Sequence, residues 1–409
     1  MRSSSPALLV VLGGICAALH VGKLPPAVPA LQQALDITLV QAGFLLSLVQ
    51  LAGMLLGLVA GLAADSLGLR RTMVAGLVVL SLAGGLGGWA REAHELMALR
   101  AVEGFGFLLA TVPAPGLIRR LVDPAHVSRT LGLWGAYMPF GAALALLAGP
   151  PFIASAGWQG WWWVLAAVSA AMAAWLWLAL PVDSLPQPTQ AAGPQASTDR
   201  LRATLRSRGP WLVALSFAMY SGQWLAVIGF LPSMYAQAGW SAALTGVATA
   251  AAAAVNMVGN IASGRLLQRG VRPERLLYAG FVAMGLGGIL AFAPVLDAVG
   301  AGPSAVLRYG AVLLFSMVGG LIPGTLFSLA IRVAPGERTV STTVGWMQQW
   351  SSAGQLAGPP LVAWVATRSG GWQWSWLVTA SCAAAGLALA AFIGQLLHRK
   401  PPPGRAGAT

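Results

Sequence analysis

Twelve apolar segments, each long enough to cross a lipid bilayer as a helix, constrain the fold of this chain more than any other feature. A transmembrane helix needs roughly 20 consecutive apolar residues. The first segment runs on into Lys23, Pro25 and Pro26 without a small-residue cleavage site, so we expect a retained helix rather than a signal peptide. The sequence therefore predicts an all-α membrane protein with twelve transmembrane helices. The segments are 6–29, 39–62, 71–90, 95–117, 128–151, 160–181, 209–236, 241–267, 274–293, 303–331, 340–364 and 371–397.

The composition excludes a protein that is surrounded by water. Of the 409 residues, 57% are hydrophobic and only 9% are charged, whereas soluble proteins carry about 25% charged residues. The two cysteines, Cys16 and Cys382, both lie in apolar segments far apart in the sequence. This excludes a disulfide framework and a cysteine-based zinc site. We expect both cysteines to be small buried hydrophobic residues, and we predict neither a metal nor a cofactor.

The basic residues indicate the orientation of the chain in the membrane. Twenty-four Lys and Arg residues against eleven Asp and Glu give a net charge of +13. In a soluble domain this excess suggests nucleic-acid binding, but in a membrane protein it marks cytoplasmic loops. With a cytoplasmic N-terminus, 19 of the 24 lie in inner segments, and the exceptions are Lys23, Arg91, Arg100, Arg308 and Arg368. We therefore expect both termini in the cytoplasm of a bacterial cell, a multi-pass inner-membrane location, and no nucleic-acid partner.

The two halves of the chain repeat one another. Short matches recur at offsets of 207 to 214 residues, and they pair Leu24-Pro25 with Leu231-Pro232, Arg100 with Arg308, Pro115-Gly116 with Pro323-Gly324, Leu147-Ala148-Gly149-Pro150-Pro151 with Leu356-Ala357-Gly358-Pro359-Pro360, and Trp158-Gln159-Gly160-Trp161 with Trp372-Gln373-Trp374. Such a duplicated six-helix unit is typical of alternating-access transporters. We divide the chain into a first bundle (1–181), a Pro- and Arg-containing cytoplasmic linker (182–208), a second bundle (209–397) and a tail expected to be disordered (398–409).

Two motifs resemble those of the major facilitator superfamily. Residues 61–71 read GLAADSLGLRR and resemble the loop G-x-x-x-D-[RK]-x-G-[RK]-[RK], although Ser66 and Leu69 stand where the family has basic residues. Arg100-x-x-Glu103-Gly104-x-Gly106 resembles the second motif, and residues 260–265 resemble a degraded second copy of the first. The resemblance implies two pseudo-symmetric six-helix bundles that rock around a central site lined by spans 1, 4, 7 and 10.

The first motif also suggests a latch at the cytoplasmic ends of the helices. The Asp65 carboxylate can interact with a neighbouring helix N-terminus, where the helix dipole favours negative charge. Arg70 and Arg71 can pair with Asp123 beyond span 4, although arginines here also serve topology. Such contacts would hold one state closed and release in the other. The gating residues that we predict are Gly61, Asp65, Gly68, Arg70, Arg71, Asp123 and Arg265.

Five charged or titratable residues lie within predicted spans: His20, Lys23, Arg100, Glu103 and Arg308. Such residues are rare in membranes and mark function by default. Three cations with one carboxylate favour an anionic substrate. Arg100 and Glu103 share a helix face, so we expect them to pair, and protonation of Glu103 or His20 would couple transport to protons. The arginines can equally extend to the headgroups, and Lys23 can simply mark the outer end of its helix.

Further polar and aromatic residues complete the predicted substrate site. Tyr220, Gln223 and Trp224 form one stripe on span 7, and Tyr137 corresponds by the repeat to Gln348. For each residue, packing or interhelical hydrogen bonding is the competing interpretation. The full predicted substrate site is His20, Lys23, Arg100, Tyr137, Tyr220, Gln223, Trp224, Asn256, Arg308, Gln348 and Gln349.

Three classes of function compete, and the sequence favours a secondary transporter. A membrane enzyme needs clustered acids or histidines such as an HExxH motif, a channel needs a filter loop or charge ring, and ATP-driven transport needs a GxxxxGK[ST] loop. The sequence contains none of these motifs. We predict a monomer that moves a small organic anion together with protons, similar to the cyanate and nitroimidazole permease-like branch of the superfamily. Efflux of drugs or metabolites by proton antiport is the alternative.

Overall fold

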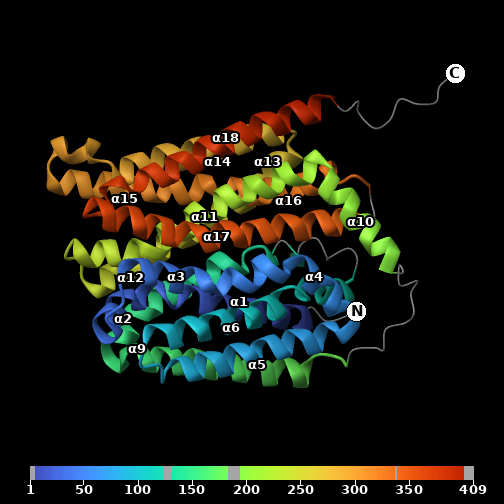
Figure 1. Ribbon diagram of the computed structural model, residues 1–409, viewed down its shortest axis with the longest axis horizontal. Coiled ribbons are helices and arrows are strands. Elements are labelled where there is room, and N and C mark those ends of the chain that lie inside the picture. The colour runs from blue at the N-terminus through green and yellow to red at the C-terminus, as the bar shows by residue number, and fades with distance from the viewer. Residues whose placement is uncertain (1–4, 124–129, 132, 183–193, 337–338, 400–409) are drawn as a thin grey trace.

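The computed structural model describes residues 5–123, 130–131, 133–182, 194–336 and 339–399, and the regular elements in these ranges are helices. Figure 1 shows two bundles lying side by side, the first in blue to green and the second in yellow-green to red. The first bundle contains α1 (Ser5–Gly22), η1 (Pro25–Ala27), α2 (Val28–Leu35), α3 (Leu39–Ser47), η2 (Leu48–Gln50), α4 (Leu51–Leu67), α5 (Leu69–Gly87), α6 (Ala93–Thr111), α7 (Ala114–Leu121) and α9 (Tyr137–Ala179). The second contains α11 (Arg208–Gln237), α12 (Ala242–Ala254), α13 (Asn256–Gln268), α14 (Pro273–Phe292), η3 (Pro294–Val299), α15 (Ala301–Gly319), α16 (Leu321–Val333), α17 (Val340–Ser369), η5 (Trp372–Trp374) and α18 (Ser375–Arg399).

The described residues contain ten helical stretches that are long and apolar enough to span a membrane. Two predicted spans, 128–151 and 160–181, fall in one of them, because α9 consists of two helices that meet at a kink at Gly157, where φ is 72°. The predicted eleventh span is α17, which is 30 residues long and falls outside the ten because polar residues such as Gln348 and Gln355 lower its hydropathy. The twelve-helix fold is thus confirmed.

Spans 1 and 2 are interrupted, which the sequence analysis did not predict. Span 1 stops at Gly22, passes through η1 and resumes as α2, because Pro25 and Pro26 lack the backbone N–H that a continuous helix needs. Span 2 changes from α3 to η2 at Leu48 and resumes as α4 at Leu51. The start of α3 is fixed by a capping box between Thr38 and Gln41. The interruptions bring irregular backbone into the bundle interior.

Two glycines of the second motif bring α6 close to its neighbours. A Cβ atom on Gly104 would lie 2.5 Å from the Val49 carbonyl oxygen of η2, and a Cβ atom on Gly106 would lie 2.8 Å from the Gly76 carbonyl oxygen of α5. A larger residue at either position would therefore push α6 outward. This close packing places Arg100 and Glu103 in the centre of the first bundle.

The bundles meet mainly along three helix pairs. Helix α17 packs against α3 and α4, and α9 packs against α12. Small residues allow the approach, because a Cβ atom on Gly43 would lie 2.9 Å from the Pro360 Cα atom, and one on Gly246 would lie 3.3 Å from the Pro150 Cγ atom. A hydrogen bond also crosses the interface, from Ser352 Oγ to Gln50 Oε1 at 3.4 Å.

The predicted linker contains a helix, α10 (Pro194–Arg206), that the sequence analysis did not predict. Its end is tied to the second bundle by a 2.8 Å hydrogen bond from Trp211 Nε1 to the Leu205 carbonyl oxygen. Figure 1 places α10, the beginning of α1 and the end of α18 at the same end of the molecule. This arrangement agrees with an even number of spans between the two termini.

Candidate functional site

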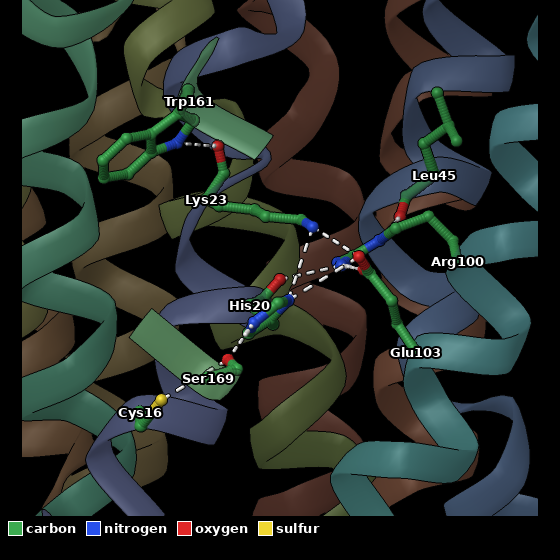
Figure 2. Close-up of polar contacts among 8 residues, drawn as sticks. All are labelled: Cys16, His20, Lys23, Leu45, Arg100, Glu103, Trp161 and Ser169. Carbon is green, nitrogen blue, oxygen red and sulfur yellow. Dashed lines mark hydrogen bonds and ion pairs between the residues drawn. The ribbon is translucent and has the colours of Figure 1, made fainter. Parts of the chain in front are cut away.

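Four of the predicted residues form a buried group in the first bundle, which we call the ion cluster: His20, Lys23, Arg100 and Glu103 (Figure 2). Their exposed fractions are 0% for the three basic residues and 1% for Glu103. His20 lies in the last turn of α1, Lys23 follows that helix, and the other two lie on α6. Residues 80 positions apart in the sequence therefore meet inside the bundle.

Glu103 pairs with two cations at once. Lys23 Nζ donates a hydrogen bond to Glu103 Oε1, while Arg100 Nη1 donates one to Glu103 Oε2. The pairing of Arg100 with Glu103 matches the prediction from their i, i+3 spacing. His20 Nδ1 lies 3.6 Å from Glu103 Oε1 and 3.4 Å from Lys23 Nζ. With a neutral imidazole, the ion cluster carries two formal positive charges and one negative charge.

Backbone carbonyls hold Arg100 in the interior. Its Nε atom donates to the Leu45 carbonyl oxygen at 3.2 Å, and its Nη1 atom donates to the His20 carbonyl oxygen at 2.7 Å. The Nη2 atom is buried without a hydrogen-bond partner in the described part of the chain. Arg100 therefore does not extend to the headgroups, which was one of the two interpretations left open by the sequence.

Two tryptophans of α9 surround Lys23. Trp161 Nε1 donates to the Lys23 carbonyl oxygen at 3.1 Å, which fixes the backbone just after the end of α1. The Lys23 Nζ atom lies 4.6 Å from the centroid of the Trp162 ring, where the aromatic face attracts a cation. Lys23 thus points into the bundle, and does more than mark the end of its helix.

Ser169 of α9 is a member of the site that the sequence analysis missed. Its Oγ atom lies 2.7 Å from His20 Nε2 and 3.4 Å from Cys16 Sγ, and both partners are buried (Figure 2). A serine in an apolar helix gives no signal in one sequence, because serine also occurs there as a small packing residue. Only the fold reveals the contact.

Arg308 does not join the ion cluster. Its Nη2 atom pairs with Asp297 Oδ1 at 2.6 Å, its Nε atom bonds Ser304 Oγ at 3.1 Å, and its Nη1 atom bonds the Ala291 carbonyl oxygen at 2.9 Å. The side chain is 27% exposed and its acidic partner 66%. The expectation that three membrane cations share Glu103 is therefore wrong for Arg308, because Asp297 in η3 supplies a carboxylate of its own.

The polar residues of the second bundle form a neutral network. Asn256 Nδ2 donates to the Ser316 carbonyl oxygen at 2.8 Å and to the Tyr220 hydroxyl at 3.0 Å. Trp224 Nε1 donates to Ser316 Oγ at 3.1 Å. These bonds join α11, α13 and α15 and fit the competing interpretation of interhelical hydrogen bonding.

The predicted glutamines and Tyr137 have different surroundings. Gln223 is buried, with Nε2 bonded to the Met219 carbonyl oxygen at 2.9 Å and Oε1 without a partner in the described residues. Gln349 Oε1 is likewise buried without such a partner, whereas Gln348 is exposed. Tyr137 stacks on Trp134, with ring centroids 4.3 Å apart. Tyr137 and Gln348 therefore lie outside the ion cluster.

The structure describes only part of the predicted latch. Gly68 separates α4 from α5 with a φ of 94°, a backbone conformation that favours glycine. Arg70 donates to the Trp177 carbonyl oxygen and lies 4.4 Å from the Trp177 ring centroid. The side chains of Arg71, Asp123 and Arg265 are exposed. Gly61 and Asp65 lie on α4, but the structure does not describe the surroundings of their side chains, so the latch stays a prediction.

No group of three or more His, Cys, Asp or Glu residues in the described ranges is arranged to hold a metal ion. The titratable residues that do converge, His20 and Glu103, lie beside two cations. The cluster thus combines two groups that exchange protons with two charged hydrogen-bond donors.

A duplicated twelve-helix bundle with a buried ion cluster defines a secondary transporter of the membrane. The sequence profile of the Major Facilitator Superfamily matches residues 10–348, and the chain belongs to that family. It is therefore a multi-pass membrane transporter of small molecules and not an enzyme.

Individual proteins resemble the chain over different shares of its length. The chain is 28% identical over 361 residues to the 2-nitroimidazole transporter of Escherichia coli (strain K12), covering 85% of this chain and 84% of that protein. It is 34% identical over 144 residues to the puromycin resistance protein pur8 of Streptomyces alboniger, covering 35% and 27% respectively. Among solved structures, an inward-facing, unoccupied bacterial homologue of the human lysosomal transporter Spinster superposes with a TM-score of 0.79 at 15% identity and covers 98% of both chains.

Proposed function

We propose that the protein imports a small organic anion together with protons, by alternating access, as a monomer in a bacterial inner membrane. The location is supported by the family and by the apolar helices, which make the chain a multi-pass membrane protein, and by its bacterial relatives. The substrate class and the coupling ion rest on the ion cluster.

The observation that carries the proposal is that Lys23 and Arg100 share one carboxylate in a fully buried place. An uncompensated buried charge is costly, so a second anion stabilises this arrangement. Arg100 Nη2 can donate a further hydrogen bond, because it is buried without an acceptor among the described residues. A carboxylate or a similarly sized anion would balance the excess positive charge and accept a hydrogen bond from Arg100 Nη2.

Glu103 supplies the coupling in this proposal. While Glu103 is ionised, it accepts hydrogen bonds from Lys23 and Arg100 and competes with a substrate anion for these two cations. When it takes up a proton, both cations become available and the anion binds in its place. Release of the anion on the other side lets Glu103 lose the proton and pair with the cations again. One anion therefore travels with one proton.

Proton-antiport efflux of drugs or metabolites is the second candidate. The relatives include a nitroimidazole transporter and a puromycin resistance protein. The neutral network of Tyr220, Trp224 and Asn256 offers aromatic faces and hydrogen bonds that suit a planar polar heterocycle. In this candidate, the protonation of Glu103 drives release rather than uptake.

Reconstituted transport distinguishes the candidates. Proteoliposomes with an inward proton gradient are tested with small monocarboxylates, their neutral amides and 2-nitroimidazole. If the protein imports an anion with protons, the anion accumulates and accumulation stops when the proton gradient collapses. In Glu103→Gln, uptake should no longer depend on the gradient, while counterflow is retained. Accumulation driven only by an opposite gradient favours antiport. Transport that ignores the gradient in the unmodified protein, or a cationic substrate, would overturn the proposal.

A further inference from the structure

The hydrogen bonds around His20 restrict which ring nitrogen carries its proton. Nδ1 lies 3.4 Å from Lys23 Nζ and 3.6 Å from Glu103 Oε1, whereas Nε2 lies 2.7 Å from Ser169 Oγ. An ammonium group has donors only, so the nitrogen that faces Lys23 accepts. The proton of a neutral His20 is then on Nε2, and Ser169 accepts it.

The Ser169 hydroxyl completes this arrangement. Because its oxygen accepts from Nε2, its own hydrogen is directed to another acceptor, and Cys16 Sγ lies 3.4 Å away. The other tautomer, with the hydrogen on Nδ1, would place an N–H against the Lys23 ammonium. Ser169 therefore stabilises the tautomer whose Nδ1 lone pair faces the ion pairs.

The surroundings of His20 contain few other groups that respond to pH. Lys23 and Cys16 face it from the α1 segment, and Glu103 and Arg100 face it from α6. Helix α5 contributes Gly84, where an added Cβ atom would lie 3.1 Å from His20 Cε1. Helix α9 contributes Ser169, which does not titrate. Among these described groups, the acid within reach of Nδ1 is Glu103.

We propose that Ser169 is a positioning residue that presents His20 as the proton acceptor for Glu103, an inference that rests on the proposed function of the ion cluster. In this step the Oε1–H bond of a protonated Glu103 breaks, and an Nδ1–H bond forms on His20. Glu103 becomes a carboxylate and His20 an imidazolium. The Nε2–H group continues to donate to Ser169. Nδ1 gives up the contact that it accepted from Lys23 Nζ, and Lys23 keeps its bond to the Glu103 carboxylate.

The first test reads the tautomer directly in the unmodified protein. In ¹⁵N-histidine-labelled protein in lipid, the His20 signal is assigned by its loss in His20→Asn. We expect a neutral ring protonated at Nε2 at high pH, and a ring protonated at both nitrogens at low pH. Finding the proton of the neutral ring on Nδ1 would overturn the inference. This measurement does not depend on any variant at Ser169.

The second test reads coupling in Ser169→Ala. Loss of the acceptor for Nε2–H destabilises the imidazolium, so the pH of half-maximal proton-driven uptake should fall by about one unit. Ser169→Thr keeps the hydroxyl and should retain the unmodified profile. Ser216→Ala is the matched control, because Ser216 is equally buried and, among the described residues, its hydroxyl bonds only the Leu212 carbonyl oxygen of its own helix, at 2.7 Å.

The outcomes separate the two proposals. If Glu103→Gln keeps proton coupling, the proposed function fails, whatever Ser169 does. If Glu103→Gln uncouples transport but Ser169→Ala shows an unchanged pH profile, the coupling site stands and the positioning role of Ser169 is wrong. An equal shift in Ser216→Ala also contradicts the inference, because it would show a general effect of losing a buried hydroxyl.

Discussion

Arg100 on α6 donates its Nε hydrogen to the carbonyl oxygen of Leu45 on α3, across 3.2 Å. Leu45 lies in the last turn of α3, just before span 2 is interrupted at η2, and the last carbonyls of a helix have no partner within it. The arginine thus connects the interruption of span 2 to Glu103. A shift of α3 against α6 would change the geometry of the ion pairs directly.

The first prediction concerns the close approach that makes this contact available. In Gly104→Ala, the new Cβ atom would lie 2.5 Å from the Val49 carbonyl oxygen, so α6 must move away from η2. We expect a loss of about 1–3 kcal/mol in stability and impaired transport. Thermal unfolding in detergent measures the stability. Gly310→Ala is the control, since an added Cβ atom meets nothing within 4 Å there; equal effects of both changes would contradict the packing argument.

The second prediction concerns substrate charge. Lys23→Gln removes a charge-assisted contact and should weaken the apparent affinity about 10- to 100-fold, with little change in protein level. Arg308→Gln should leave affinity unchanged, because that arginine pairs with Asp297 at 2.6 Å away from the ion cluster. Concentration-dependent counterflow measures both. Normal affinity in Lys23→Gln means that Lys23 does not contact the substrate.

The third prediction concerns the balance of buried charge. Glu103→Gln leaves Lys23 and Arg100 without their shared carboxylate, and breaking a buried ion pair in this way costs about 3–5 kcal/mol. The double variant Lys23→Met with Glu103→Gln restores the original formal charge of the cluster. We expect unfolding temperatures to rank Glu103→Gln below the double variant. The reverse order would show that charge does not determine the stability of the ion cluster.

The fourth prediction concerns the latch. Asp65→Asn removes a charge at a helix end without changing packed volume, so insertion should be normal and cycling impaired. Single cysteines introduced at each membrane face, in a background with Cys16→Ser and Cys382→Ser, report the inside-to-outside labelling ratio. An unchanged ratio together with normal transport would exclude a gating role for Asp65.

The sequence predicts the scaffold well because spans and orientation depend on local composition. The Arg100–Glu103 pair follows from helical spacing, and the glycines beside it follow from the motif. In contrast, Lys23 meets Glu103 because span 1 packs against α6, which the sequence does not reveal. The partners of the cluster's polar atoms, Ser169 and the Leu45 carbonyl, carry no local signal, because their role is set by which helices are neighbours. Arg308 was misplaced for the same reason: its carboxylate comes from η3.

The neutral network of the second bundle has a consequence for how such proteins diverge. Among the described residues, the fully buried ion pairs lie in the first bundle, whereas the Arg308–Asp297 pair of the second bundle is partly exposed. Changes at Tyr220, Trp224 or Asn256 therefore alter hydrogen-bonding and aromatic surfaces without disturbing buried charge. Under the proposed function, new solute preferences can arise in the second half while the first keeps its proton coupling, so one energy source is compatible with a wide range of solutes.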